Sequence, residues 1–150
     1  MVYERHKARY GTHRIYDAMK LREDCFISAA NLADALIENE QFAEAKSILR
    51  EQIPMADETN EHYINLYRNA AAFLRRKLAK ALLLDGVPSL NDLNEAVALL
   101  EEVDRTCEDL FDKSHSDAQV VKAELKKARA KLARARKAVA RRAAATAAGA

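Results

Sequence analysis

The stretch NLADALIENEQFAEAKSIL, residues 31–49, joins two amphipathic segments across a short polar break at Glu40 and Gln41. Its apolar residues recur at spacings of three and four, which is typical of a helix with one buried face. Small residues stand at Ala33 and Ala45, where the two helices of a hairpin could approach closely. The large residues that should fill the space between hairpins are Leu32, Leu36 and Leu49. This stretch predicts a helical hairpin.

A second stretch, KLAKALLLDGVPSLNDLNEAVALL at residues 77–100, repeats the pattern. Leu32 corresponds to Leu78 at an interval of 46 residues, and Ala45 corresponds to Ala96 at an interval of 51. The difference of 5 residues falls at the DGVPS turn, where an insertion is easily accommodated. Self-similarity at this interval predicts stacked hairpins, each covering one face of its neighbour.

The whole chain is predicted to be all-α. Only three Gly and two Pro occur in 150 residues, too few for the turns that a sheet requires. We expect Pro54 to end or kink the second helix, and ADETNE (56–61) to form a loop. Ser89 and Asp92 should form a variant capping box at the next helix start. The expected helices span about 15–38, 42–53, 61–84, 89–111 and 116–142.

This pattern divides the chain into four parts. They are an N-terminal segment (1–14), two hairpins (15–112), a basic capping or docking helix (113–142) and a disordered tail (143–150). A plain antiparallel helical bundle is the structural alternative.

The last helix combines a heptad seam with strong positive charge. The seam residues, at spacings of three and four, are Ala118, Val121, Leu125, Ala128, Leu132, Ala135 and Val139. Residues 122–142 hold ten of the 25 basic residues and one of the 23 acidic ones, a net +9. The rest of the chain, with 15 basic and 22 acidic residues, carries a net −7. An acidic body therefore bears a basic helix.

Three interpretations of the basic helix remain open. It could cap the second hairpin through its seam, dock onto another protein as a coiled-coil helix, or bind an acidic partner such as nucleic acid. The absence of aromatic residues from the helix disfavours stacking on nucleic-acid bases. The residues expected to meet an acidic partner are Lys126, Lys127, Arg129, Lys131, Arg134, Arg136 and Lys137.

The two hairpins resemble tetratricopeptide repeats, particularly those of kinesin light chains. The resemblance rests on NLADALIENEQFAEAKSIL and LAKALLLDGVPSLNDLNEAVALL and covers about residues 26–112. The chain departs from the family where Leu36 and Leu82 replace an aromatic residue and Gln52 replaces a small one. The resemblance implies a concave groove that binds an extended peptide or a helix. It places Asn31, Asp34, Glu38, Arg76, Lys77 and Lys80 in that groove, with Arg76 and Lys80 positioned to hold a carboxylate.

Other classes of function have little support. Cys25 and Cys107 form no C-x-x-C pair, the four histidines are scattered, and the three glycines are isolated, so we expect no catalytic, metal or cofactor site. No apolar run approaches a membrane span, and residues 1–10 do not read as a secretory signal. We expect a non-catalytic adaptor in the cytoplasm or nucleus that binds another protein. The alternatives are a structural subunit of a larger assembly and nucleic-acid binding through the basic helix.

Overall fold

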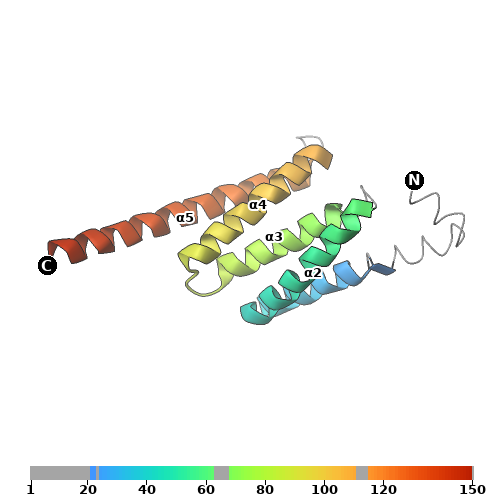
Figure 1. Cartoon of the computed structure of the whole chain (residues 1–150), viewed down its shortest axis with the longest axis horizontal. Coiled ribbons are helices and arrows are strands. Elements are labelled where there is room, and N and C mark those ends of the chain that lie inside the picture. Colours follow the sequence, from blue (N-terminus) through green and yellow to red (C-terminus); the bar gives the residue numbers. More distant parts are fainter. Residues whose placement is uncertain (1–20, 23, 63–67, 111–114, 150) are drawn as a thin grey trace, which may run out of the picture.

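The computed structural model describes residues 21–22, 24–62, 68–110 and 115–149, and within them it confirms the all-α prediction. These residues contain helices and turns and no strand. The first helix, here called the N-terminal helix, spans 24–38. It is followed by α2 (Phe42–His62), α3 (Arg68–Leu84), α4 (Leu90–Leu110) and α5 (Ser116–Ala148). Successive helices run antiparallel and stack side by side (Figure 1).

The core lies where the helices cross, and small residues mark the crossings. Ala33, Ala45, Ala79 and Ala96 are all fully buried, as expected of positions that let two helices approach closely. One continuous cluster joins side chains from all five helices. Its large members include Leu36, Leu49, Leu74, Leu82, Leu100 and Leu125.

Leu32 departs from the expectation that it would lie between hairpins. Its side chain is 50% exposed, whereas its counterpart Leu78 is 2% exposed. The reason is position in the stack. Helix α3 has a neighbour on each side. It forms an ion pair with Asp34 of the N-terminal helix on one side and with Glu124 of α5 on the other. Leu32 stands on the outer helix of the described stack.

The polar break at Glu40 and Gln41 forms a compact helix C-cap. The Gln41 amide donates to the Leu36 carbonyl at 2.8 Å, and the Glu40 amide donates to the Ile37 carbonyl at 3.1 Å. This pair of bonds is the Schellman arrangement, which requires a left-handed residue, and Glu40 takes that conformation with φ 60°. Glycine usually fills this position, so Glu40 carries backbone strain.

Pro54 does not end α2, contrary to one of the two outcomes expected, because the helix continues through Pro54 to His62. The predicted loop at 56–61 is therefore wrong. Tertiary contacts offset the backbone bond lost at proline. Ala56 is fully buried in the core, and Asp57 accepts a 2.6 Å ion pair from Arg75 on α3. Residues 63–67, including part of the helix expected over 61–84, lie outside the described residues.

The DGVPS turn and the capping box are confirmed. Gly86 has φ +41° in the turn between α3 and α4. The Asp92 amide donates to Ser89 Oγ at 3.1 Å, and the Ser89 amide donates to Asp92 Oδ2 at 3.0 Å. The two side chains thus satisfy each other's backbone amides at the start of α4.

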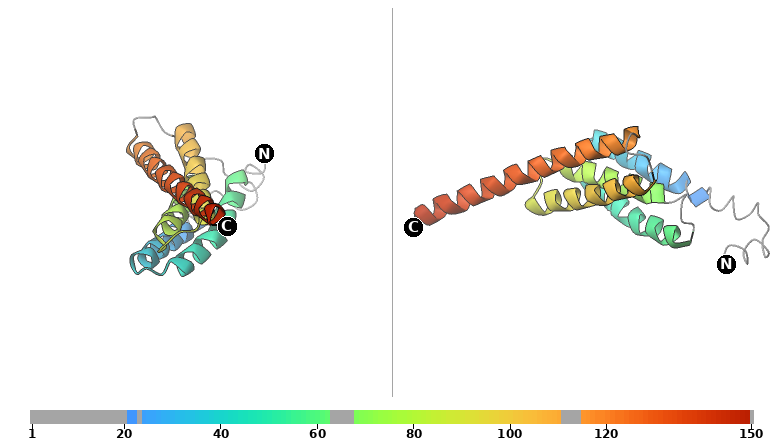
Figure 2. Two further views of the ribbon diagram at one scale, coloured as in Figure 1. Left: turned by 90° about the vertical axis from the view of Figure 1, so that its left-hand side faces the viewer. Right: turned by 90° about the horizontal axis from the view of Figure 1, so that it is seen from above.

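Helix α5 packs along α4, contacts α3 through Glu124 and Lys131, and then continues beyond both. The first five residues of the predicted seam, Ala118 to Leu132, are buried. The last large one, Val139, is 47% exposed. Both Figure 1 and the right-hand view of Figure 2 show α5 running past the turn that joins α3 to α4. The helix extends to Ala148, through most of the segment expected to be disordered.

Candidate protein-binding faces

The charged residues predicted for a groove lie where the N-terminal helix, α3 and α5 stand side by side. Asp34 Oδ2 accepts a short hydrogen bond from Lys77 Nζ, and Asp34 Oδ1 lies 3.5 Å from Lys80 Nζ. The Lys77 ammonium also lies 4.9 Å from the centroid of the Phe73 ring, within range of a cation–π interaction. Lys77 is therefore held from two sides, while the Lys80 side chain is 45% exposed.

Arg76 forms the corresponding link between α3 and α5. Its Nε and one terminal nitrogen each donate to Glu124 at 2.7 Å, one to each carboxylate oxygen. This bidentate geometry is the strongest form of an arginine–carboxylate pair. These hydrogen bonds raise the pKa of Arg76 above its ordinary value, against the lowering effect of burial. The carboxylate that Arg76 holds thus belongs to the chain itself.

We call the exposed side carrying Asp34, Arg76, Lys77, Lys80 and Glu124 the ion-pair face. The other two predicted groove residues, Asn31 and Glu38, are exposed on the N-terminal helix. Asn31 lies one turn before Asp34 on the same side of that helix.

Sequence reasoning missed three exposed apolar residues on this face. Ile27, Phe73 and Val120 are 45%, 39% and 43% exposed. Ile27 and Phe73 stand seven residues before Asp34 and Lys80, and Val120 stands four residues before Glu124, so each shares a side with a charged residue of this face. We call these three residues the apolar row. The available signal was the repeat interval, because they are 46 and 47 residues apart, close to the interval from Leu32 to Leu78.

The predicted basic residues of α5 divide into two groups. Three of them fasten α5 to the body. Arg129 pairs with Glu101 at 2.8 Å, Arg136 donates to the Asn94 side-chain oxygen at 2.7 Å, and Lys131 donates to the Leu83 carbonyl at 2.5 Å. The Lys131 contact satisfies a carbonyl in the last turn of α3, where a positive charge is favourable. The remaining exposed residues are Lys126, Lys127, Arg134 and Lys137.

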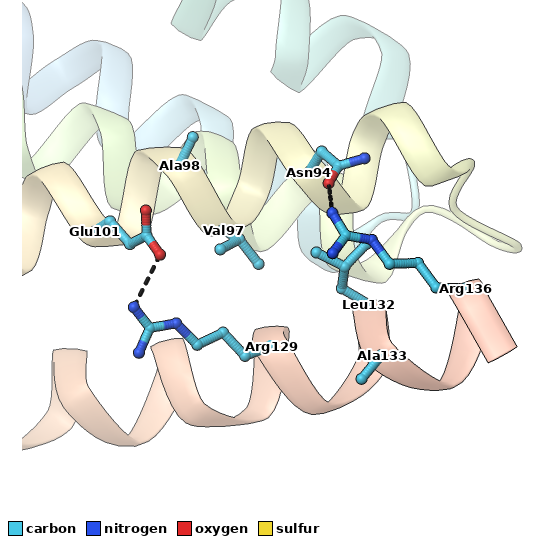
Figure 3. A pocket seen from close by; sticks show the side chains of 8 residues that line it. All are labelled: Asn94, Val97, Ala98, Glu101, Arg129, Leu132, Ala133 and Arg136. Atoms are coloured by element: carbon cyan, nitrogen blue, oxygen red, sulfur yellow. Dashed lines mark hydrogen bonds and ion pairs between the residues drawn. The ribbon is translucent and has the colours of Figure 1, made fainter.

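A groove of about 430 Å³ runs between α4 and α5 on another side of the molecule. Figure 3 shows Val97 and Leu132 between the two helices, with the Glu101–Arg129 pair toward one end and the Asn94–Arg136 contact toward the other. The small residues Ala98 and Ala133 line its walls. The groove therefore has an apolar floor and polar ends. Sequence reasoning did not predict it.

The described residues offer few groups for catalysis or metal binding. They contain no cluster of three histidine, cysteine or acidic side chains arranged to hold a metal ion. Cys107 is buried, and desolvation, together with Asp104 and Asp117, raises the pKa of its thiol. His115 caps α5 by accepting a hydrogen bond from the Asp117 amide at 3.3 Å. The described helices also include none long and apolar enough to cross a membrane.

Comparisons with protein-family models, with curated proteins and with solved structures found no match to this chain.

Proposed function

We propose that this chain is a non-catalytic protein-interaction module that binds an extended peptide or a helix across its ion-pair face, as tetratricopeptide-like hairpins would. The observation that carries the proposal is the apolar row. Ile27, Phe73 and Val120 come from three helices and are left partly exposed at equivalent positions. A solvated face would need no such repetition, and aligned exposed apolar residues favour an interaction surface.

The spacing of the row suits a peptide that crosses the helices. The three helices of the row are linked by the Asp34–Lys77 and Arg76–Glu124 ion pairs. In a polyproline II segment, residues i and i+3 lie on one side about 9 Å apart, because this helix has three residues per turn and rises about 3.1 Å per residue. A bound segment would therefore place an apolar side chain on each member of the row in turn.

The charges around the row favour acidic residues in the ligand. Lys80 and Lys127 are exposed two turns beyond Phe73 and Val120. Arg76 and Lys77 are already neutralised by Glu124 and Asp34. The exposed lysines are thus the cations that can attract a partner, and Asn31 supplies an amide for its backbone.

The test is selection from a random peptide library on the immobilised protein, followed by titration of the selected peptides. We expect the triple variant Ile27→Gln, Phe73→Gln and Val120→Gln to raise Kd by at least about tenfold. Val87→Gln is the matched control, because Val87 is 98% exposed on the α3–α4 turn, away from this face. Selected peptides that bind the triple variant as tightly as the parent would refute the proposal.

A second candidate function is that of a structural subunit, and the exposure of Leu32 favours it. An apolar position that is buried in the second hairpin is open in the first. If another protein covers it, the isolated chain should show a melting temperature that rises with concentration or with a partner. A monomer whose melting is independent of concentration would favour the binding module.

A further inference from the structure

The α4–α5 groove continues onto the projecting part of α5. Ala133 lies in the groove wall, and Ala140, seven residues later, falls on the same side of the helix beyond it. Val139 continues the seam of which Leu132 is the last fully packed large residue. The groove and this extension together form an elongated strip with small and apolar residues along its length.

Charge along the strip is one-sided. Between residues 133 and 148 there are five basic residues and no acidic one. Within the groove, Glu101 neutralises Arg129, but Arg136 contacts only the neutral amide of Asn94 among the described residues that line the groove. Positive potential therefore increases from the groove toward the end of α5.

We propose that this strip docks an amphipathic helix of another protein whose flanks are acidic. This inference is independent of the ion-pair face. Two antiparallel helices leave a groove that accepts the ridge of a third, and the alanines allow close approach. Val97, Leu132 and Val139 supply the apolar contact. The acidic flank would meet Arg136 and the bases beyond it, so its carboxylates should concentrate at the end that lies along the projecting part of α5.

Two other occupants fit less well. A second copy docking through the same strip would bring five uncompensated bases against five more. Nucleic acid would contact the basic side chains of α5 but would leave the apolar floor of the groove unburied. The strip also has no aromatic side chain on which nucleobases could stack.

The experiment uses the full chain and a fluorescein-labelled 21-residue helical peptide with Leu and Ala on one side and Glu on the flanks. A scrambled peptide of equal composition and a duplex DNA oligonucleotide are the comparison probes. Ala98→Gln with Ala133→Gln fills the groove without removing a buried side chain. Ala130→Gln, an exposed alanine of α5 outside the groove, is the matched control.

We expect the helical peptide to bind more tightly than the scrambled one. The groove-filling pair should raise its Kd by at least about tenfold, and Ala130→Gln should leave it unchanged. Arg136→Gln with Arg141→Gln should weaken binding and flatten its salt dependence. In the unmodified chain, peptide-induced NMR shifts should fall on α4 and α5, a readout that does not depend on any variant.

Several outcomes would overturn the proposal. They are equal affinity for the scrambled peptide, unchanged affinity after the groove is filled, and shifts confined to other helices. DNA binding that is tighter than peptide binding and unchanged by the groove-filling pair would show that the basic side chains of α5 bind nucleic acid. A concentration-dependent dimer that blocks the peptide would assign the strip to self-association.

Discussion

Arg76 on α3 and Glu124 on α5 are joined by two hydrogen bonds of 2.7 Å across 48 residues of sequence. Glu124 is the only acidic residue between 122 and 142. The single carboxylate among residues 122–142 is therefore the one that attaches α5 to the second hairpin. This pair helps to fix the register of α5, and with it the alignment of Val120 with Phe73.

Reversing one charge of this pair should destabilise the fold. Arg76→Glu places two carboxylates together, and the swap Arg76→Glu with Glu124→Arg should recover part of the loss. Because both side chains are partly exposed, we expect a coupling energy of about 0.5–1 kcal/mol. Urea unfolding of the four members of the double-mutant cycle measures it. Strictly additive effects would show that the pair contributes nothing.

The capping box should make stability depend on pH in acid. Hydrogen bonds from Ser89 hold the pKa of Asp92 below its usual value. Because the folded-state pKa is the lower one, this stabilisation is complete above the unfolded pKa of about 3.9 and is lost as pH falls through the folded value.

Two variants test the capping box. Ser89→Ala should cost about 1 kcal/mol at neutral pH. Asp92→Asn should reduce the slope of stability against pH between about 4 and 2. Chemical denaturation across this range is the measurement, with Glu51→Gln on the exposed side of α2 as control. A slope unchanged by Asp92→Asn would contradict the assignment.

Two turn positions should respond in opposite directions to substitution. Glu40→Gly relieves the positive φ of a non-glycine residue and should stabilise the protein by about 0.5–1 kcal/mol. Gly86→Ala should destabilise it by about 1 kcal/mol. Nothing lies within 4 Å of the added Cβ at Gly86, so that cost comes from φ alone. Thermal melts of both variants decide the matter, and a loss of stability in Glu40→Gly would contradict the strain argument.

The two cysteines should differ sharply in reactivity. Cys25 is exposed, whereas Cys107 is buried and its thiol has a raised pKa. At pH 8 the native protein should label rapidly at Cys25. Cys107 should react at least roughly a hundredfold more slowly, because its labelling requires opening of the fold. Cys25→Ser isolates the second rate. Fast labelling of that variant under native conditions would show that the packing around Cys107 is open.

The helical periodicity was sufficient to predict the hairpins, because it depends on local spacing and on the small residues at crossings. It could not predict where α5 loses its neighbours. The seam is as regular at Ala135 and Val139 as at Val121 and Leu125, but α4 begins at Leu90 and covers only the earlier part. Likewise, the prediction at Pro54 considered only the backbone hydrogen bond that proline removes. The burial of Ala56 in the core stabilises the helix beyond Pro54 in spite of that loss.

The candidate site was predicted in part for the same reason. A charged face containing Arg76, Lys77 and Lys80 follows from spacing within one helix. The structure also pairs Arg76 with Glu124 and Lys77 with Asp34. These ion pairs depend on how three helices align, which no local sequence pattern specifies. The apolar row was accessible through the repeat interval, but in the sequence its members stand beside the buried residues Phe26, Leu74 and Val121 and merge with the core pattern.

Pro54 gives α2 two sections that can exchange their amide hydrogens independently. It contributes no N–H to the helix, so the ladder of backbone bonds is interrupted there. Before it, Ala45 and Leu49 anchor the helix in the core, whereas after it the contacts are Ala56 and the Asp57–Arg75 pair. Deuterium should therefore enter the second section through partial openings that leave the first protected.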